Sequence, residues 1–196
     1  MDLFQPLIDH ISKKIPLTED EVKEFISHFK VTKIKKRQFI IQPDFIPRYR
    51  NYVVKGSFRA YVVADKGEEY TIQLAVEDWW ISDYNSYIFQ QPASMFVVAM
   101  EDSIILQIDY ESEQHLKSAN HKYETFFRKM AESSVAAMQR RLISNHTKTA
   151  EERFEEFEKK YPVIAQRIPQ YVLASFLGMT TQYLSKLRNI RVSRKS

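Results

Sequence analysis

The sequence of 196 residues contains no cysteine and only three glycines. The lack of cysteine excludes disulfides, cysteine-ligated zinc, iron–sulphur clusters and thiol catalysis. Three glycines cannot build a glycine-rich phosphate loop, and a Gly-x-Ser-x-Gly motif is absent as well. We therefore expect a protein that is not an enzyme and has no catalytic residues.

Histidine is also scarce, and its positions argue against a metal site. A metal-dependent enzyme built on a β-roll needs His and carboxylate ligands clustered on its strands. All five histidines instead fall in segments that read as helix or hinge: His10, His28, His115, His121 and His146. Carboxylates at turn-like positions are most simply explained as solvated side chains: Glu68, Glu69, Glu101 and Asp102. The sequence predicts no metal and no cofactor.

Long apolar runs are missing too. No segment approaches the roughly 20 apolar residues of a membrane-spanning helix. Met1 to Phe4 open the chain without the basic region and apolar stretch of a signal peptide. The 44% share of hydrophobic residues is nevertheless enough for a real core, in one ordinary domain plus a small one. We expect a cytoplasmic protein that does not bind a membrane.

Acidic residues are absent from the last 38 residues, Lys159 to Ser196, which hold eight Lys or Arg. Because the whole chain has 29 basic and 25 acidic residues, the part before this tail is net acidic. The tail also carries apolar residues at helical spacing, so it is not a disordered basic arm. A folded, basic, helical C-terminus is typical of DNA-binding modules, because each phosphate contact releases counterions.

Before the tail, the residue pattern changes from one typical of helices to one typical of strands. Leu3 to Ile11 show helical spacing, and Thr18 to Glu21 form a capping box that begins a second helix. Short β-branched and aromatic runs separated by turn signals then follow, as in a sandwich or a barrel-like roll. Six strands are predicted: Phe39–Ile41, Tyr52–Val54, Phe58–Val63, Tyr70–Leu74, Met95–Ala99 and Ile104–Ile108.

From Leu116 to Arg141, apolar and small residues recur at steps of three and four, with no Gly or Pro. This pattern predicts one helix of roughly 30 residues, far longer than the globular mean of about 11–12, so it must lie against something. One interpretation is a core helix that covers the roll. We favour a helix that pairs with its copy in a homodimer, because the small residues of Ala131 to Ala137 allow close approach.

A second capping box, Thr149 to Glu152, begins a helix from Ala150 to Lys160 that Pro162 stops. The hinge between two domains is therefore expected near Asn145 to Lys148. Three parts follow: residues 1–109 form the roll with its N-terminal helices, residues 110–146 the dimerisation helix and hinge, and residues 147–196 a helix-turn-helix.

The helix-turn-helix is predicted from spacing within the tail. Pro169 opens the first helix, Gly178 permits a left-handed turn, and Thr180 caps the second helix. Ala174 and Leu184 stand where two helices crossing at about 90–120° touch. Leu184, Leu187 and Ile190 form the inner face of the second helix.

The outer face of the second helix predicts contacts with DNA. Gln, Asn and Lys reach base edges there, Ser and Thr reach bases or phosphates, and Arg suits phosphates. The predicted contact residues are Thr180, Thr181, Gln182, Ser185, Lys186, Arg188, Asn189 and Arg191. A plain helical hairpin with a solvated basic face is the alternative, and the absence of acid from the tail favours DNA.

Several short motifs point to one protein family: Tyr52 to Ser57, Gly67 to Leu74, Asp78 to Ile81, and Arg140 to Leu142. With its order of roll, long helix and helix-turn-helix, the chain resembles the Crp/Fnr transcription regulators over nearly its full length. The resemblance implies an α+β fold with a double-stranded β-helix, jelly-roll-like sensor of the cyclic nucleotide-binding type, a dimerisation helix and a winged-helix-like helix-turn-helix. Only six residues follow Ile190, so we expect a truncated wing.

In function, the resemblance implies a homodimer that binds double-stranded DNA at a pseudo-palindromic operator, and it allows RNA polymerase as a further partner. A signal in the roll would shift the hinge and so change the spacing of the two recognition helices. The alternative from another class is a small-molecule-binding module whose basic tail contacts protein or RNA. A third interpretation keeps DNA binding without any sensing.

The ligand-binding motif departs from the family pattern. Members that bind cyclic AMP use a Gly-Glu pair for the ribose and an Arg-Ser or Arg-Thr pair for the phosphate; here these positions hold Ile81-Ser82 and Ala93-Ser94. Without that Arg, a buried phosphate lacks the cation that offsets its desolvation, unless Arg48, Arg50 or Arg59 supplies one. We expect no response to cyclic AMP.

Whether the roll binds another effector stays open at this point. Trp80, Ser82, Asp83 and Ser94 are the candidate ligand-binding residues. The aromatic residues around them favour either a more apolar ligand or a core that they fill themselves: Trp79, Trp80, Tyr84, Tyr87 and Phe89.

Overall fold

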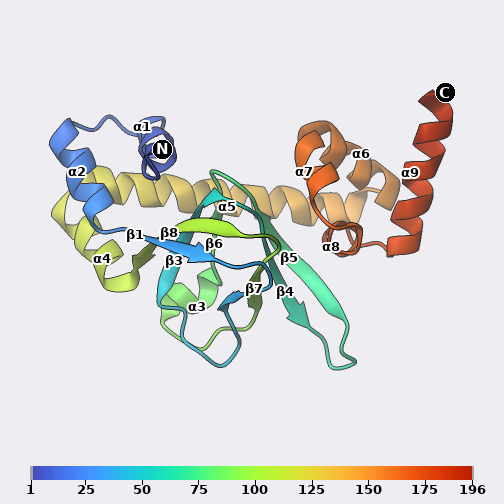
Figure 1. Ribbon diagram of the computed structural model, residues 1–196, viewed down its shortest axis with the longest axis horizontal. Helices are drawn as coiled ribbons and strands as arrows, with labels where there is room; N and C mark the ends of the chain where they lie inside the picture. Colours follow the sequence, from blue (N-terminus) through green and yellow to red (C-terminus); the bar gives the residue numbers. More distant parts are fainter. Residues whose placement is uncertain (1, 196) are drawn as a thin grey trace.

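The structure, a computed structural model, describes the backbone of residues 2–195 and the side chains of residues 2–190. A β-roll flanked by helices forms its N-terminal part, and short helices form its C-terminal part (Figure 1). The strands are β1 Lys30–Ile34, β2 Phe39–Ile41, β3 Tyr49–Lys55, β4 Phe58–Val63, β5 Glu69–Ala75, β6 Trp80–Ile81, β7 Phe96–Ala99 and β8 Ser103–Asp109. The helices are α1 Gln5–Ser12, α2 Glu19–Ser27, α3 Tyr84–Phe89, α4 Tyr110–Ala119, α5 His121–Thr147, α6 Ala150–Lys160, α7 Pro162–Arg167, α8 Gln170–Phe176 and α9 Thr181–Lys195.

The roll consists of two four-stranded sheets, with strand orders β1-β8-β3-β6 and β2-β7-β4-β5. All neighbouring strands are antiparallel, and the register of β3 with β8 sets Val53 opposite Ile105. This arrangement confirms the predicted α+β class and the jelly-roll-like fold of the N-terminal part.

All six predicted strands are present, as β2, β3, β4, β5, β7 and β8. Strand β1 was missed because it is an edge strand with mostly exposed residues, so no apolar alternation marks it. Strand β6 was missed because it has only two residues. Helix α3 was missed as well; it begins after Asp83, whose side chain accepts a hydrogen bond from the Ser86 amide.

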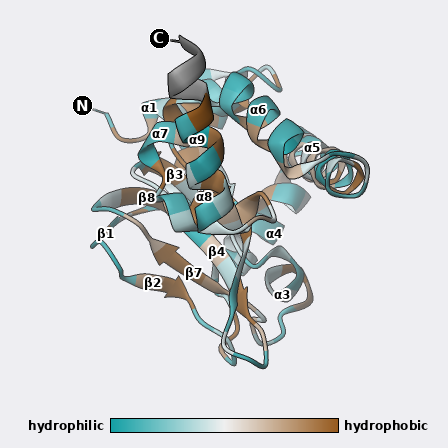
Figure 2. Cartoon of the chain, turned by 90° about the vertical axis from the view of Figure 1, so that its right-hand side faces the viewer, coloured by the Kyte–Doolittle hydropathy of each residue, from teal (hydrophilic) through white to brown (hydrophobic). Residues whose placement is uncertain are grey.

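The two sheets enclose an apolar core. Val53, Phe58, Val97 and Ile105 have no exposed surface. Because successive residues of a strand point to opposite faces, each strand contributes alternate side chains to this core. Strands β2 and β7 are accordingly brown in the hydropathy view (Figure 2).

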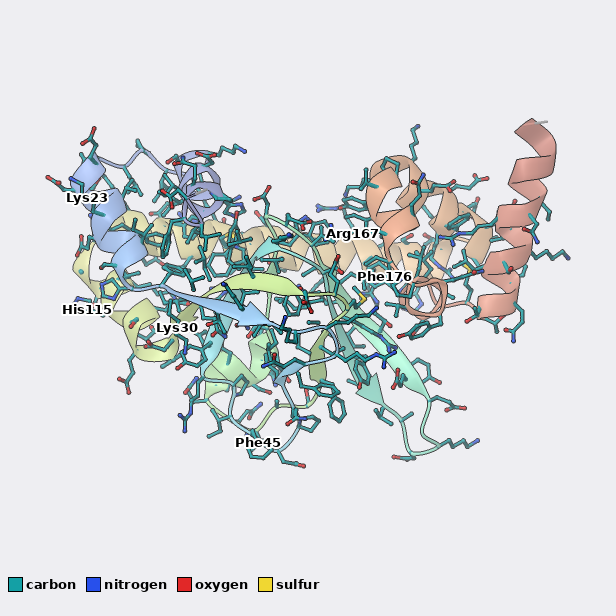
Figure 3. The ribbon with its side chains drawn as sticks, viewed as in Figure 1. Lys23, Lys30, Phe45, His115, Arg167 and Phe176 are labelled. Atoms are coloured by element: carbon teal, nitrogen blue, oxygen red, sulfur yellow. The ribbon has the colours of Figure 1, made fainter. Side chains whose placement is uncertain are left out.

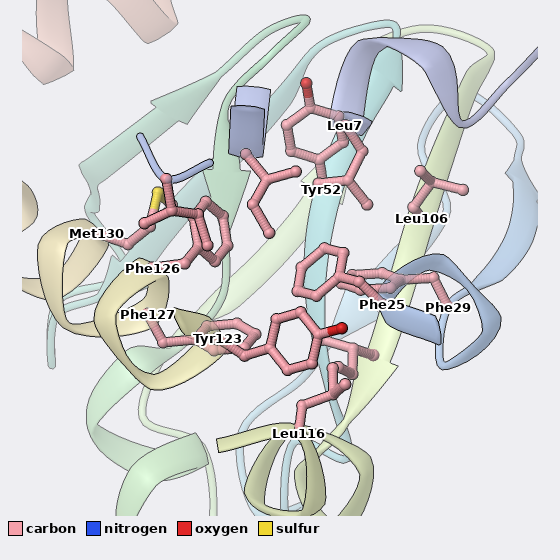
Figure 4. Close-up of a cluster of buried hydrophobic side chains, with 13 residues drawn as sticks. Leu7, Phe25, Phe29, Tyr52, Leu106, Leu116, Tyr123, Phe126, Phe127 and Met130 are labelled. Carbon is pink, nitrogen blue, oxygen red and sulfur yellow. The ribbon is translucent and has the colours of Figure 1, made fainter. Parts of the chain in front are cut away.

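Helices cover the outer face of the β1-β8-β3-β6 sheet. Tyr52 and Leu106 of the sheet meet Leu7, Phe25 and Phe126 of the helices in one buried cluster (Figure 4). Fully burying side chains of this size stabilises the fold by about 1.5–3 kcal/mol each. The cluster fixes α1, α2 and the first half of α5 to the roll.

The prediction of a single helix from Leu116 to Arg141 is wrong, because the helix is interrupted at Asn120. This residue is extended, with φ −148° and ψ 121°, and its side chain accepts a hydrogen bond from the Lys122 amide at the start of α5. Its Nδ2 also donates to Oε1 of Glu21 on α2, at 3.1 Å. An Asn side chain that binds nearby backbone competes with the helix, so α4 ends here and α5 begins.

The two halves of α5 have different surroundings. Tyr123 and Met130 in the first half are buried against the roll. In the second half Val135, Met138 and Leu142 expose 64%, 62% and 59% of their surface. Their spacing places these three on one face of the helix. The first half is therefore a core helix, and the second half carries an open apolar face.

The C-terminal helices build a third core that also includes the roll. The capping box of Thr149 is present, so α6 begins at Ala150 as predicted. Pro162 does more than stop α6, since it occupies the first turn of α7, where its missing N–H costs nothing. Leu74 of β5 joins the same cluster as Phe154, Leu173 and Leu184. The helix-turn-helix is thus packed directly on the roll.

Candidate nucleic-acid interface

The turn between α8 and α9 has the geometry expected of a helix-turn-helix. Gly178 has φ +68°, a conformation that residues with a side chain adopt only with strain. The Met179 amide donates to the Ala174 carbonyl at 3.0 Å and so closes the end of α8. Arg153 on α6 donates from Nε to the Leu177 carbonyl at 2.9 Å. Arg153 therefore braces the turn, a role that no local sequence pattern indicates.

Helix α9 presents the two faces that its sequence predicts. The Tyr183 amide donates to Oγ1 of Thr180 at 3.1 Å, so Thr180 caps the helix. Leu184 and Leu187 are buried. Five of the predicted contact residues lie on the opposite, exposed side: Thr180, Thr181, Gln182, Lys186 and Asn189. Ser185 is half-buried.

One of the two arginines predicted to contact phosphate has a partner within the protein. Arg188 is half-buried, and its Nη2 donates to the Ala165 carbonyl of α7 at 2.7 Å. Its guanidinium thus lies at the side of α9, over α7. The side chain of Arg191 lies outside the described residues. Tyr183, which sequence reasoning missed, is 40% exposed directly beside the contact face.

Some charge in the acid-free tail is used inside the protein. Arg167 donates from Nε to Oε1 of Glu101 at 2.9 Å. Glu101, which the sequence predicts to be solvated, keeps 40% of its side-chain surface exposed and also pairs with Arg167. The exposed Glu69 likewise pairs with Arg59. Arg167 and Glu101 are 66 positions apart, so composition alone does not reveal that this tail cation has partners within the protein.

Three of the four candidate ligand-binding residues lie together at the start of α3. The fully buried Asp83 carboxylate accepts hydrogen bonds from the Ser94 amide at 2.8 Å and the Ser94 hydroxyl at 3.1 Å. It also accepts the Ser86 amide at 3.3 Å, as the N-cap of α3. Ser82 is next to it, with Oγ 3.4 Å from the Tyr49 carbonyl. The donors of Ser94 are thus occupied by an internal carboxylate.

The fourth candidate, Trp80, lies elsewhere. Its ring packs on Tyr52 at 5.3 Å and Phe29 at 6.1 Å, on the helix-covered face of the sheet. Among the other aromatic residues of this segment, Tyr87 is buried whereas Phe89 is 70% exposed. The roll interior is instead filled mainly by aliphatic residues and Phe58.

Two of the three arginines considered as substitutes for the missing phosphate ligand have other partners. Arg50 forms a buried ion pair with Glu113 on α4, at 3.2 Å. Arg59 donates from Nε to Oγ1 of Thr71 at 2.9 Å and pairs with Glu69. Both guanidinium groups are therefore committed away from Ser94.

A surface hollow of about 710 Å³ lies between β2 and the loop that follows it, and Arg48 lies in its wall. Phe45, Tyr49 and Gln90 also line it, but none of the four candidate ligand-binding residues does. Over the described part of the chain, no cluster of three or more His, Asp or Glu is arranged to hold a metal ion. No helix within residues 2–195 has the length and apolar character needed to cross a membrane.

The arrangement is shared with solved transcription regulators. FixK2 from Bradyrhizobium japonicum aligns with a TM-score of 0.73 at 15% identity, covering 85% of this chain and 86% of its own. The regulator CLP from Xanthomonas campestris aligns with a TM-score of 0.69 at 12% identity, covering 90% and 93%. A regulator of the Crp/Fnr family from Eubacterium rectale gives 0.69 at 16% identity, covering 98% and 89%.

The sequence itself matches no protein-family model and no curated protein. The likeness is therefore one of structure, and it extends over roll, long helix and C-terminal helices. The chain has the Crp/Fnr-type fold, as its motifs led us to expect.

Proposed function

We propose that the chain is a homodimeric transcription regulator, not an enzyme, that binds a pseudo-palindromic site in double-stranded DNA and does not respond to cyclic AMP. The observation that carries the proposal is the exposed face of α9, where Thr181, Gln182 and Lys186 stand opposite the buried Leu184. An α-helix fits the major groove, and these residue types match base edges and phosphates there. RNA polymerase is the partner through which such a regulator would act.

The open face of α5 supports the homodimer. Val135, Met138 and Leu142 alternate in steps of three and four, the spacing of core positions in a two-stranded coiled coil. Exposed apolar stripes of this kind are unfavourable in water unless a partner covers them. A second copy offers the same stripe, and the pair would set two α9 helices about 34 Å apart, one turn of DNA.

The surroundings of Asp83 support the lack of response to cyclic AMP. A phosphate approaching Ser94 would meet a carboxylate that already holds its donors. Two like charges at such a distance repel strongly where solvent is excluded. Arg50 and Arg59 are paired with Glu113 and Glu69, so neither compensates the added charge.

Selection of genomic DNA fragments by the purified protein tests the proposal. We expect enrichment of a palindromic motif, unchanged by added cyclic AMP. A motif that is recovered only with the nucleotide would contradict the independence from cyclic AMP. Failure to enrich any motif would contradict DNA recognition itself.

The spacing of the half-sites distinguishes this function from a basic tail that contacts protein or RNA. Insertion of half a helical turn, about five base pairs, should abolish binding by a rigid dimer, because the two α9 helices then face different sides of the DNA. Insertion of a full turn should weaken binding less. Binding that is indifferent to both insertions, with a shallow salt dependence, would favour the alternative.

A further inference from the structure

Arg167 lies at the end of α7 (Figure 3). It binds two glutamates from different turns of the roll. Nη1 and Nη2 donate to the two carboxylate oxygens of Glu77, at 2.6 and 2.9 Å. Nε donates to Oε1 of Glu101 at 2.9 Å. Bidentate pairs of this type are stronger and more directional than single contacts. We call Arg167, Glu77 and Glu101 the clamp.

The β3–β4 turn gathers the two glutamates. The Gly56 amide donates to Oε1 of Glu77 at 2.7 Å, and the Ser57 hydroxyl donates to Glu101. Gly56 is required here, because its φ is +107° and a Cβ would lie 2.0 Å from Oγ of Ser103. Burial by itself would raise the pKa of Glu77, but hydrogen bonds from Arg167 and Gly56 hold the pKa below its usual 4.5. The roll thus presents a paired anionic site to α7.

A second contact fixes α8 to the free edge of a sheet. Strand β5 ends the order β2-β7-β4-β5, so one side of its backbone lacks a neighbouring strand. The Ser175 hydroxyl accepts the Thr71 amide at 2.8 Å and donates to the Glu69 carbonyl at 3.1 Å. The first helix of the helix-turn-helix therefore covers an edge that would otherwise be open to pairing.

The long helix reaches the same place. Arg141 of α5 donates to the Thr71 carbonyl at 3.3 Å and to the Ile72 carbonyl. Its guanidinium lies 4.2 Å from the ring centre of Phe176 on α8. The dimerisation helix, the roll and the helix-turn-helix thus meet at β5, with the clamp beside them.

We propose that the clamp holds the helix-turn-helix on the roll in its DNA-binding orientation and is the releasable part of this contact. The inference rests on the proposed function and assigns the regulation of the same site. The docked position leaves Gln182 and Lys186 on the outer face of α9 exposed. The clamp side chains are 30–40% exposed, unlike the buried apolar contacts, so changes in solvent or partner reach them first.

The energetic role follows from preorganisation. Two recognition helices must enter two successive major grooves. A helix-turn-helix that moves freely relative to the roll therefore loses orientational entropy when it binds DNA. If loss of the clamp lowers the docked fraction to about a fifth or a tenth, apparent DNA affinity falls about 5- to 10-fold.

The variant that tests this is Glu77→Gln/Glu101→Gln, because it changes the roll and leaves every tail cation in place. DNA affinity is measured by fluorescence anisotropy on the selected site. The interdomain distance is measured by pulsed EPR between spin labels on cysteines introduced at Lys66 and Lys159, both exposed, in this cysteine-free chain. We expect a broader distance distribution and a 5- to 10-fold loss of affinity. Asp20→Asn, which removes an exposed pair with Lys23 on α2, is the matched control and should change neither.

A second variant separates the clamp from direct DNA contact. Arg167→Gln should broaden the distance distribution in the same way, and adding it to the double glutamate variant should give no further broadening, because one interaction is being removed twice. An unchanged distance distribution in either variant would overturn the clamp. A gain in affinity with a broader distribution would overturn the DNA-binding orientation. A parent protein that binds no DNA would instead count against the proposed function, while the EPR comparison still tests the clamp.

Discussion

Arg50 and Glu113 form an ion pair, 3.2 Å long, whose side chains expose only 6% and 0% of their surface. The Tyr87 hydroxyl donates to the other carboxylate oxygen at 3.1 Å, and Lys117 pairs with the same group. Strand β3 and helices α3 and α4 are therefore joined at one buried carboxylate. Arg50 and Tyr87 donate hydrogen bonds to this carboxylate, which has no exposed surface.

Glu113→Gln should destabilise the protein by about 3–5 kcal/mol, because it leaves the Arg50 charge buried without its counterion. The measurement is the free energy of unfolding from urea titrations. Glu132→Gln removes an exposed pair with Arg128 on α5 and should cost at most about 0.5 kcal/mol. An equal loss of unfolding free energy in the two variants would show that burial does not determine how much the Arg50–Glu113 pair contributes to stability.

Some of this fold follows from local sequence, and the reason is physical. The capping boxes of Thr18 and Thr149 each join residues three positions apart, so the sequence contains the whole interaction. The strands with apolar alternation, such as Phe58–Val63, are likewise marked by their own residues. Gly178 is marked because few other residues accept its backbone conformation.

The rest depends on partners that meet only in the folded chain. Arg50 and Glu113 are 63 positions apart, and no period relates them. Arg167 reads as one of several tail cations until Glu77 is beside it. Helical spacing continues through Asn120, and its contact with Glu21 from α2 is likewise invisible to a local pattern. The outer face of α9 was predictable because it belongs to a single helix.

His10 gives the stability a specific dependence on pH. The ring is packed between Tyr52 and Phe126, with centroids at 5.5 and 6.0 Å, and burial, aided by Lys14, lowers its pKa from 6.5 to about 4. Between about pH 4 and pH 6.5 the His10 ring is protonated in the unfolded chain but neutral in the folded protein. The protein therefore loses stability as pH falls below 6.5, and the contribution of His10 to the free energy of unfolding does not change with pH above that value.

We expect His10→Leu to reduce this slope. After allowance for the solvent that reaches this half-buried ring, the parent should lose about 1 kcal/mol more than the variant between pH 7.5 and pH 5. Urea titrations at the two pH values measure the difference, and the carboxylates common to both proteins cancel. Parallel losses in parent and variant would assign the acid sensitivity to other groups.

Asp83 should contribute to stability through the hydrogen bonds that its carboxylate accepts. Asp83→Ala removes the N-cap of α3 and leaves the two Ser94 donors without their acceptor, at a cost of about 2–3 kcal/mol. The neighbouring Ser82→Ala removes only a 3.4 Å contact with the Tyr49 carbonyl and should cost less than 1 kcal/mol, roughly the value of one weak hydrogen bond. Chemical denaturation of both variants provides the comparison. If Asp83→Ala leaves the free energy of unfolding unchanged, the hydrogen bonds that this carboxylate accepts do not stabilise the fold.

The apolar face of α5 predicts how the oligomer responds to charge. Met138→Glu/Leu142→Glu places two carboxylates in the proposed dimer contact between the apolar faces of two α5 helices, which we call the seam. The change should convert a dimer to monomers, because each paired helix would bring like charges together. Sedimentation analysis measures the mass directly. Lys129→Glu, on the same helix but bonded to the Lys14 carbonyl of its own chain, is the control and should leave the dimer intact. A monomeric parent would contradict the seam altogether.

Three changes in α9 should affect DNA binding in different ways. Lys186→Ala should weaken binding to all sequences similarly and reduce the salt slope by about one, since an exposed lysine acts on phosphate charge. Gln182→Ala should relax preference at one base pair, losing about 1–3 kcal/mol of discrimination. Arg188→Ala should leave the salt slope unchanged, because that guanidinium is held by the Ala165 carbonyl. Anisotropy titrations at several salt concentrations separate the three, with Lys23→Ala at the far end of the molecule as the charge-matched control (Figure 3). If Lys186→Ala and Gln182→Ala both bind like the parent, the recognition face is not this side of α9.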